Sequence, residues 1–216
     1  GQTAWSELLN YARYHDLTSA EGWAYIQEHL DVPEMIDWLI LECWSGDIDV
    51  YENVRFYASP DYENGKYLYG LADMDLTMMG TDTMSVGFNN FQLHGIIPAA
   101  LRGNAEFRDM FLTRLGEMLR GPLSDENAQK TLDELRAVVE PETARDLARW
   151  GKSSTLFITQ MANLRDFVSG RAEVVKNGAI AFFGVSAEEA AKYFNVSVGE
   201  ENTAVAAVQD YTKLYC

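Results

Sequence analysis

Five oxygen-bearing side chains flank a segment of the sequence that is typical of a β-hairpin. Asp47, Asp49 and Asn53 precede this segment, and Asp73 and Asp75 follow it. Because an antiparallel hairpin returns the chain to where it began, we expect Asp49, Asn53 and Asp73 to lie at one edge, within reach of one ion. Carboxylates together with substrate phosphates are the ligands that Mg²⁺ prefers. The spacing alone also fits ordinary loop acids, because 33 acidic residues produce such clusters by chance.

The hairpin is predicted from two β-prone runs. Residues 54–57 and 67–71 alternate in polarity, and the turn-rich residues 59–65 join them. Elsewhere the period of the apolar residues is mainly helical. The sequence therefore predicts an α+β, mainly α-helical fold with one antiparallel β-hairpin, in a single domain spanning residues 1–216.

Caps and apolar periodicity place the helices. We expect helix starts at a Thr18/Glu21 capping box, at Asp31, Asn104 and Ser124, at Pro141 as a first-turn proline, and at a Ser186/Glu189 capping box. A long helix is predicted over residues 154–177 and a helix end at Gly46. Residues 76–103 are rich in Gly, Met and Thr and are expected to form a long, partly ordered loop. Residues 182–216 are an uncertain tail, and the segment from Val196 fits either a short strand pair or a loop.

Charge and composition exclude several classes of function. The formal net charge is −16, and Lys and Arg form no cluster, which argues against nucleic acid and anionic membrane surfaces. No run of 18 apolar residues occurs, so no membrane span is expected. The two cysteines, Cys43 and Cys216, make neither a disulfide framework nor a zinc site, and whether they pair stays open.

Two other chemistries fit the sequence less well than the metal site does. Asp49 and Asp73 could form the carboxylate pair of a glycosidase, but nothing in the chain specifies a sugar-binding platform. The three histidines have no metal-ligand spacing, which disfavours a zinc hydrolase. His94 falls in the expected loop, where it could approach the site.

The order of several motifs resembles the catalytic half of the CotH-type kinases, atypical protein kinases first known from spore coats. The resemblance covers residues 5–181. An apolar helix at residues 31–42 leads into a Gly-Asn-x-Asp-like motif, an Asn follows, and an Asp-x-Asp motif comes after the second strand. The matching segments are Ser45-Gly46-Asp47-Ile48-Asp49, Asn53, Ala72-Asp73-Met74-Asp75, Leu101-Arg102-Gly103-Asn104-Ala105-Glu106-Phe107-Arg108 and Leu164-Arg165-Asp166-Phe167-Val168-Ser169-Gly170-Arg171.

The resemblance implies a fold like a kinase C-lobe and assigns roles to the residues around the hairpin. Asp49 matches the catalytic Asp that accepts or orients the substrate hydroxyl proton, and Asn53 and Asp73 match the metal ligands. Asp75 is a secondary metal candidate, and Asp47 competes with Asp49 for the catalytic role. The implied cofactors are Mg²⁺ (or Mn²⁺) and ATP, and the implied acceptor is a protein Ser/Thr or a surface-layer partner. An extracellular, cell-surface or spore-surface location is also implied, although these 216 residues carry no recognisable export signal.

Three departures from the family pattern support a second hypothesis. Asp47 stands where the family usually has Asn, and Asn53 follows Asp49 one residue earlier than in some relatives. Ala72 replaces an aromatic residue before the metal-binding Asp. The glycine-rich loop and the strand Lys of a nucleotide-binding N-lobe do not occur in this sequence. We therefore expect this chain alone to be inactive, and the alternative is a non-catalytic surface or structural module that keeps the fold.

Overall fold

A computed structural model describes residues 2–80, 83–153 and 155–195. These residues form helices and a single two-stranded antiparallel sheet. The prediction of an α+β, mainly α-helical fold is confirmed. The expectations for residues 196–216, including the Cys43–Cys216 pair, lie outside the described residues. No described helix is both long enough and apolar enough to span a membrane.

The body is built around α3 (Val32–Ser45), which α1 (Gln2–Tyr14) and α2 (Ala20–His29) precede. The Asp31 side chain caps α3 as predicted, and Gly46 ends the helix with a φ of 65° that favours glycine. α3 is buried on most sides because it is apolar nearly all round. The predicted cap of α2 was wrong by one residue. The Ser19 hydroxyl caps it, while Thr18 donates to the Asp16 carboxylate.

The predicted hairpin is confirmed. Strands β1 (Arg55–Ala58) and β2 (Tyr67–Gly70) pair antiparallel, with Arg55 opposite Gly70 and Ala58 opposite Tyr67, and a 3₁₀ turn η1 (Glu63–Gly65) lies between them. β2 is anchored to the start of α3. The Asp31 amide donates to the Tyr67 carbonyl at 3.0 Å, and the Tyr69 amide donates to the Glu34 carboxylate at 2.9 Å. These contacts fix the hairpin against α3.

The expectation of a long loop over residues 76–103 was largely wrong. Four short elements follow β2: η2 (Met74–Leu76), α5 (Met84–Gly87), η3 (Leu93–Gly95) and α6 (Ile96–Leu101). They were not recognised because each is too short to show a helical period. Tertiary packing holds them, since Met84, Ile97 and Leu101 are buried in the core.

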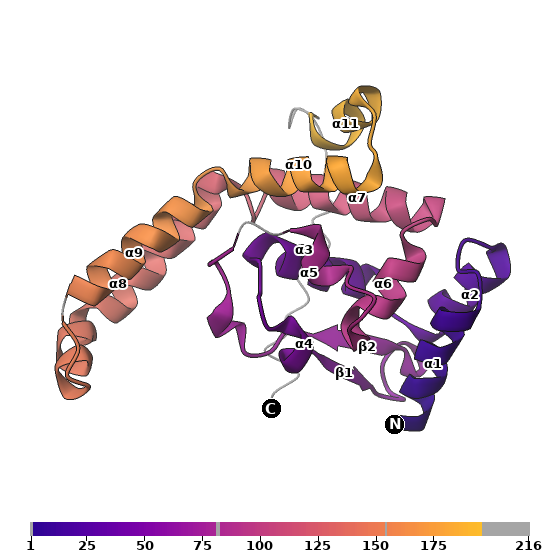
Figure 1. Cartoon of the computed structure of the whole chain (residues 1–216), viewed down its shortest axis with the longest axis horizontal. Helices are drawn as coiled ribbons and strands as arrows, with labels where there is room; N and C mark the ends of the chain where they lie inside the picture. The colour runs from indigo at the N-terminus through magenta and orange to yellow at the C-terminus, as the bar shows by residue number, and fades with distance from the viewer. Residues whose placement is uncertain (1, 81–82, 154, 196–216) are drawn as a thin grey trace.

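A second layer of helices covers α3 (Figure 1). It consists of α7 (Ala105–Arg120) and α10 (Arg171–Phe183), and α11 (Ala187–Phe194) packs on α7. The predicted Asn104 cap of α7 and the Ser186/Glu189 capping box of α11 are both confirmed. α7 and α10 contact α3 and each other. Phe107 and Phe111 of α7 are fully buried in this layer.

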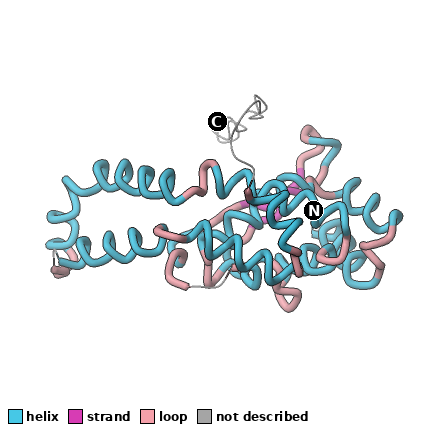
Figure 2. Tube along the Cα trace, turned by 90° about the horizontal axis from the view of Figure 1, so that it is seen from above, coloured by secondary structure: helices cyan, strands magenta, loops and turns pink. Residues whose placement is uncertain are grey.

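Two further helices leave the body as an arm (Figures 1 and 2). These are α8 (Asp125–Arg149) and α9 (Thr155–Val168), and Ser124 caps α8 as predicted. Pro141 does not start a helix but lies inside α8. The helix predicted over residues 154–177 is divided into α9 and α10, because Gly170 adopts a left-handed φ of 79°.

Candidate functional site

The chain between α3 and the hairpin carries the first group of predicted site residues. Asp49 occupies the N-cap position of the short helix α4 (Val50–Asn53), which ends at Asn53. The Asn53 side-chain amide donates to Oδ2 of Asp49 at 2.9 Å. Oδ1 of Asp47 accepts the Asp49 backbone N–H at 3.0 Å. The structure thus brings Asp47, Asp49 and Asn53 together as one hydrogen-bonded group.

The end of α3, from which this group projects, is firmly held. The last carbonyls of a helix have no intrahelical partner. Here the Gly46 amide donates to the Glu42 carbonyl, and the Met78 amide donates to the Ser45 carbonyl at 2.7 Å. Arg171 satisfies the two carbonyls in between, with Nε at 2.6 Å from Trp44 O and Nη2 at 3.0 Å from Cys43 O. A buried guanidinium therefore fixes the helix end that leads into Asp47.

Arg171 was noticed in the sequence only as part of a motif, and its contact with α3 was not predicted. It is 3% exposed and begins α10, and its guanidinium lies over the Phe167 ring at 4.6 Å from the centroid. A cation is favoured at a helix C-terminus. The sequence separation of 127 residues to Trp44 left no local signal for this pairing.

Asp73 and Asp75 lie on the neighbouring segment. Since Arg55 pairs with Gly70, the residues after β2 run back alongside α4. The Leu76 carbonyl also accepts the Ile48 amide at 3.2 Å. Asp73 has left-handed backbone angles (φ 52°, ψ 54°). Both carboxylates are exposed and form no hydrogen bond or ion pair with any described residue. The structure therefore places their backbone beside the Asp47–Asp49–Asn53 group without joining their side chains to it.

A buried acid that the sequence analysis missed completes the group. Glu42, on the last turn of α3, is 1% exposed, and Asp47 is 2% exposed. Burial raises the pKa of Glu42 to about 8, and the nearby charges of Asp47 and Asp49 raise it further. Burial is also the main reason that the pKa of Asp47 is raised. Glu42 is therefore largely protonated at neutral pH.

The oxygens that remain unsatisfied show what this group can bind. Oδ1 of Asp49 and Oδ2 of Asp47 are buried and accept no hydrogen bond from any described residue. The Asn53 side chain contacts Asp49 through its amide nitrogen, and its oxygen forms no hydrogen bond with a described residue. Such oxygens fit a hard divalent cation or a hydroxyl donor in chemical type. Among the described residues, no group of three or more His, Cys, Asp or Glu side chains is positioned to coordinate a metal ion.

The remaining predicted candidates lie elsewhere. His94 does not approach the site: it is fully buried, its Nε2 contacts the Val86 carbonyl at 2.9 Å, and burial lowers its pKa. Cys43 is a buried free cysteine on α3, and burial raises the pKa of its thiol.

Comparison with known proteins identifies the family. The family described as CotH kinase protein matches residues 1–175 of the chain. A search of curated proteins found no match, and neither did a search of solved structures. The match covers the hairpin, the Asp47–Asp49–Asn53 group and Arg171. The chain belongs to the CotH kinase family.

Proposed function

We propose that this chain carries the catalytic residues of a metal-dependent phosphoryl transfer from ATP to a protein Ser or Thr. The observation that carries the proposal is the Asp49–Asn53 contact at 2.9 Å, beside a buried and unsatisfied Oδ1 of Asp49. This arrangement occurs in a member of a kinase family, at the junction of α3 and the hairpin.

The roles of the protein groups follow from the contacts. Asp49 would accept the proton of the acceptor hydroxyl at Oδ1, while the amide of Asn53 holds the other oxygen and so orients the carboxylate. Asp47 accepts the Asp49 backbone N–H, and Glu42 lies buried nearby with its pKa raised. Asp47 is thus a positioning residue, and the catalytic role falls to Asp49.

The residues that would hold Mg²⁺ or Mn²⁺ are Asn53 and Asp73, with Asp75 as a secondary ligand. The bound cation would neutralise charge on the ATP phosphates, which is the main electrostatic contribution in phosphoryl transfer. The exposed Asp73 carboxylate has no competing partner among the described residues, so it is available for this role. The association of the CotH family with the spore coat supports a surface location and a surface-layer protein as the acceptor.

A non-catalytic module is the second candidate, and one observation favours it. That observation is the Asp73 side chain, which forms no hydrogen bond with the Asp49–Asn53 pair. Ala72, in place of the family's aromatic residue before Asp73, agrees with it. In that case the hydrogen-bonded group would only stabilise the junction between α3 and the hairpin.

Calorimetric titration with Mn²⁺ separates the two candidates. Asp73→Ala should abolish Mn²⁺ binding with an unchanged helical circular dichroism spectrum. Asp61→Ala, which removes an exposed acid of the hairpin loop, is the matched control and should bind as wild type does. Equal Mn²⁺ affinity for wild type and Asp73→Ala would rule out the proposed metal site.

Autophosphorylation with Mn²⁺ and ATP tests the catalytic step in a protein that joins this chain to a nucleotide-binding N-lobe, because the chain alone is expected to be inactive. Asp49→Asn keeps the size of the side chain and should lower the rate by about 10²–10⁴-fold, because the proton acceptor is lost. An unchanged rate would exclude Asp49 as the catalytic base. Mn²⁺ binding without phosphoryl transfer in wild type would favour the non-catalytic module.

A further inference from the structure

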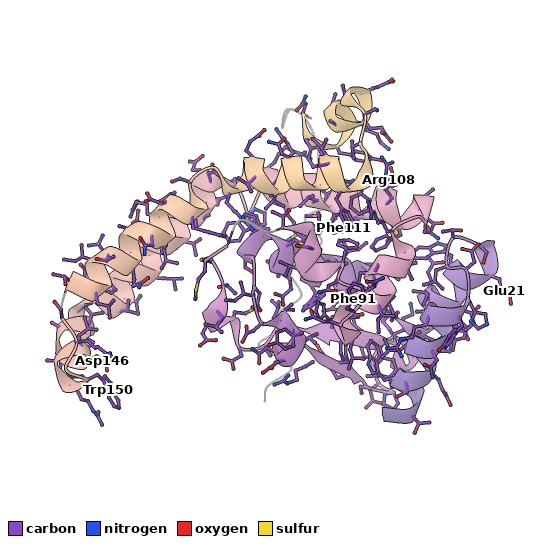
Figure 3. The ribbon with its side chains drawn as sticks, viewed as in Figure 1. Glu21, Phe91, Arg108, Phe111, Asp146 and Trp150 are labelled. Atoms are coloured by element: carbon purple, nitrogen blue, oxygen red, sulfur yellow. The ribbon has the colours of Figure 1, made fainter. Side chains whose placement is uncertain are left out.

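The arm formed by α8 and α9 is a feature of the fold that the candidate site does not explain. Its two helices run side by side away from the body, and Asp146 and Trp150 mark its far end (Figure 3). At the near end, Gln129 donates to the Arg165 carbonyl at 3.0 Å. Asp125 accepts the amides of Gly170 and Ala172, at 2.6 and 3.1 Å, and so ties α8 to the start of α10. The arm is therefore rigidly connected to the body only at its base.

The arm exposes apolar surface that a solitary helix pair would not normally retain. None of the 25 residues of α8, all of which the structure describes, is buried. Leu135, Val138 and Val139 are 60%, 75% and 48% exposed, and Ile158 on α9 is 65% exposed. Residues 153–164 contain no charged residue in a chain that is 23% charged. Leu135, Val138 and Val139 share one face of α8 because they are spaced i, i+3 and i+4. Exposed apolar side chains gathered on one face in this way mark an interaction site.

The charge pattern indicates what the arm can pair with. Residues 125–170 carry six basic and eight acidic residues, which is −2 of the total charge of −16. Most of the negative charge therefore lies on the body, so two bodies repel each other, whereas the arm is nearly neutral. The base of the arm, residues 125–135 and 162–170, has two basic and five acidic residues, whereas the far half, residues 136–161, has four basic and three acidic. An antiparallel pairing would place the positive far half of one arm on the negative base of another.

We infer that the arm is the surface through which two copies of this chain form an antiparallel dimer. The α8 helices would cross at their midpoint, which is residue 137, so that Leu135 and Val138 of the two copies pack together. A twofold interface places the same patch on both partners. α8 is about 37 Å long and a helix pair is about 20 Å wide. Two such faces bury up to about 1,500 Å² in total, which is the size of a stable interface.

Sedimentation velocity over a range of protein concentrations tests the dimer. Wild type should show a concentration-dependent dimer. Val138→Glu should raise the dissociation constant of this dimer by at least about thirtyfold, because the two introduced charges would meet at the twofold axis. Phe91→Glu is the matched control, since Phe91 is 95% exposed but lies outside the arm, and it should dimerise as wild type does. The inference would be overturned if wild type stayed monomeric, or if Val138→Glu left the dimer unchanged. Either result would indicate that the arm binds a different protein.

Cysteine cross-linking tests the antiparallel geometry. In a Cys216→Ser background, Val138→Cys should form a disulfide-linked dimer on mild oxidation, because the two copies of residue 138 lie near the axis. The buried Cys43 should not react. Trp150 is 66% exposed, and Trp150→Cys should not cross-link, since the two copies of residue 150 would lie about 39 Å apart. Cross-linking through residue 150 but not through residue 138 would contradict the antiparallel arrangement.

Discussion

Replacing Arg171 with methionine tests how the site is held at the end of α3. The guanidinium donates to the carbonyls of Cys43 and Trp44, two residues that directly precede the Ser45–Gly46 turn into Asp47. Methionine has a similar length and can still pack on the Phe167 ring, but it donates no hydrogen bond. Arg171→Met therefore removes the hydrogen bonds and the charge and leaves most of the packing.

The expected loss of stability follows from the groups left behind. Each buried carbonyl without a donor costs about 1–3 kcal/mol, and the lost contact of the cation with the aromatic ring adds about 0.5–2 kcal/mol. Removing the buried charge also removes its desolvation penalty, which offsets part of this cost. We expect the free energy of unfolding to fall by about 3 kcal/mol. With a urea m-value of about 2 kcal/mol/M, the unfolding midpoint should fall by about 1.5 M.

Urea denaturation of Arg171→Met should be compared with Arg136→Met. Arg136 is partly exposed on α8 and pairs with Glu140 in the same helix, so its loss should lower the stability far less than the loss of Arg171. Amide exchange should also increase over residues 43–49 in Arg171→Met alone. If the two variants are equally stable, or if exchange over residues 43–49 is unchanged, Arg171 does not anchor the site.

Three further predictions concern the stability of the body and the arm. Glu34→Gln keeps an acceptor for the Tyr69 amide and should remove the Glu34 contribution to the pH dependence of stability. Burial raises the pKa of Glu34 from 4.5 to about 8, so its stabilising contribution is complete below pH 4.5 and is lost at about 1.4 kcal/mol per pH unit up to pH 8. Thermal melts from pH 5 to 9 should show a slope that is shallower by this amount in Glu34→Gln than in wild type, and the remaining slope is expected from Glu42, whose pKa is raised into the same range. Asn104→Ala removes the cap of α7 and the 2.8 Å bond to the Leu17 carbonyl, and chemical denaturation should show a loss of about 2–3 kcal/mol. Pro141→Ala restores a hydrogen bond inside α8, so amide exchange in the arm should slow by about ten- to a hundredfold; faster exchange would contradict this reading of α8.

The elements that were predicted correctly all depend on signals between residues close in sequence. The hairpin was recognised from two alternating runs and a turn, and α3 from its Asp31 cap, its apolar residues and Gly46. The same local chemistry identified the capping box of α11. Side chains and backbone groups within four residues of each other meet in almost any tertiary context, so these patterns could be read directly.

The errors arose where distant packing outweighs a local preference. Pro141 usually begins or breaks a helix, yet α8 continues through it, and α9 and α10 are separated at Gly170, where Asp125 from another helix accepts the adjacent amides. α5 and α6 are too short to show a period and depend on burial against the core.

The same distinction applies to the candidate site. The sequence alone identified Asp49, Asn53 and Asp73, because the return of the chain through a hairpin is a local property. Only the tertiary structure determined that Asn53 binds Asp49, that Glu42 is buried beside Asp47, and that Arg171 holds the end of α3. Burial and pairing over more than a hundred residues depend on the assembled core, and no pattern of neighbouring residues encodes them.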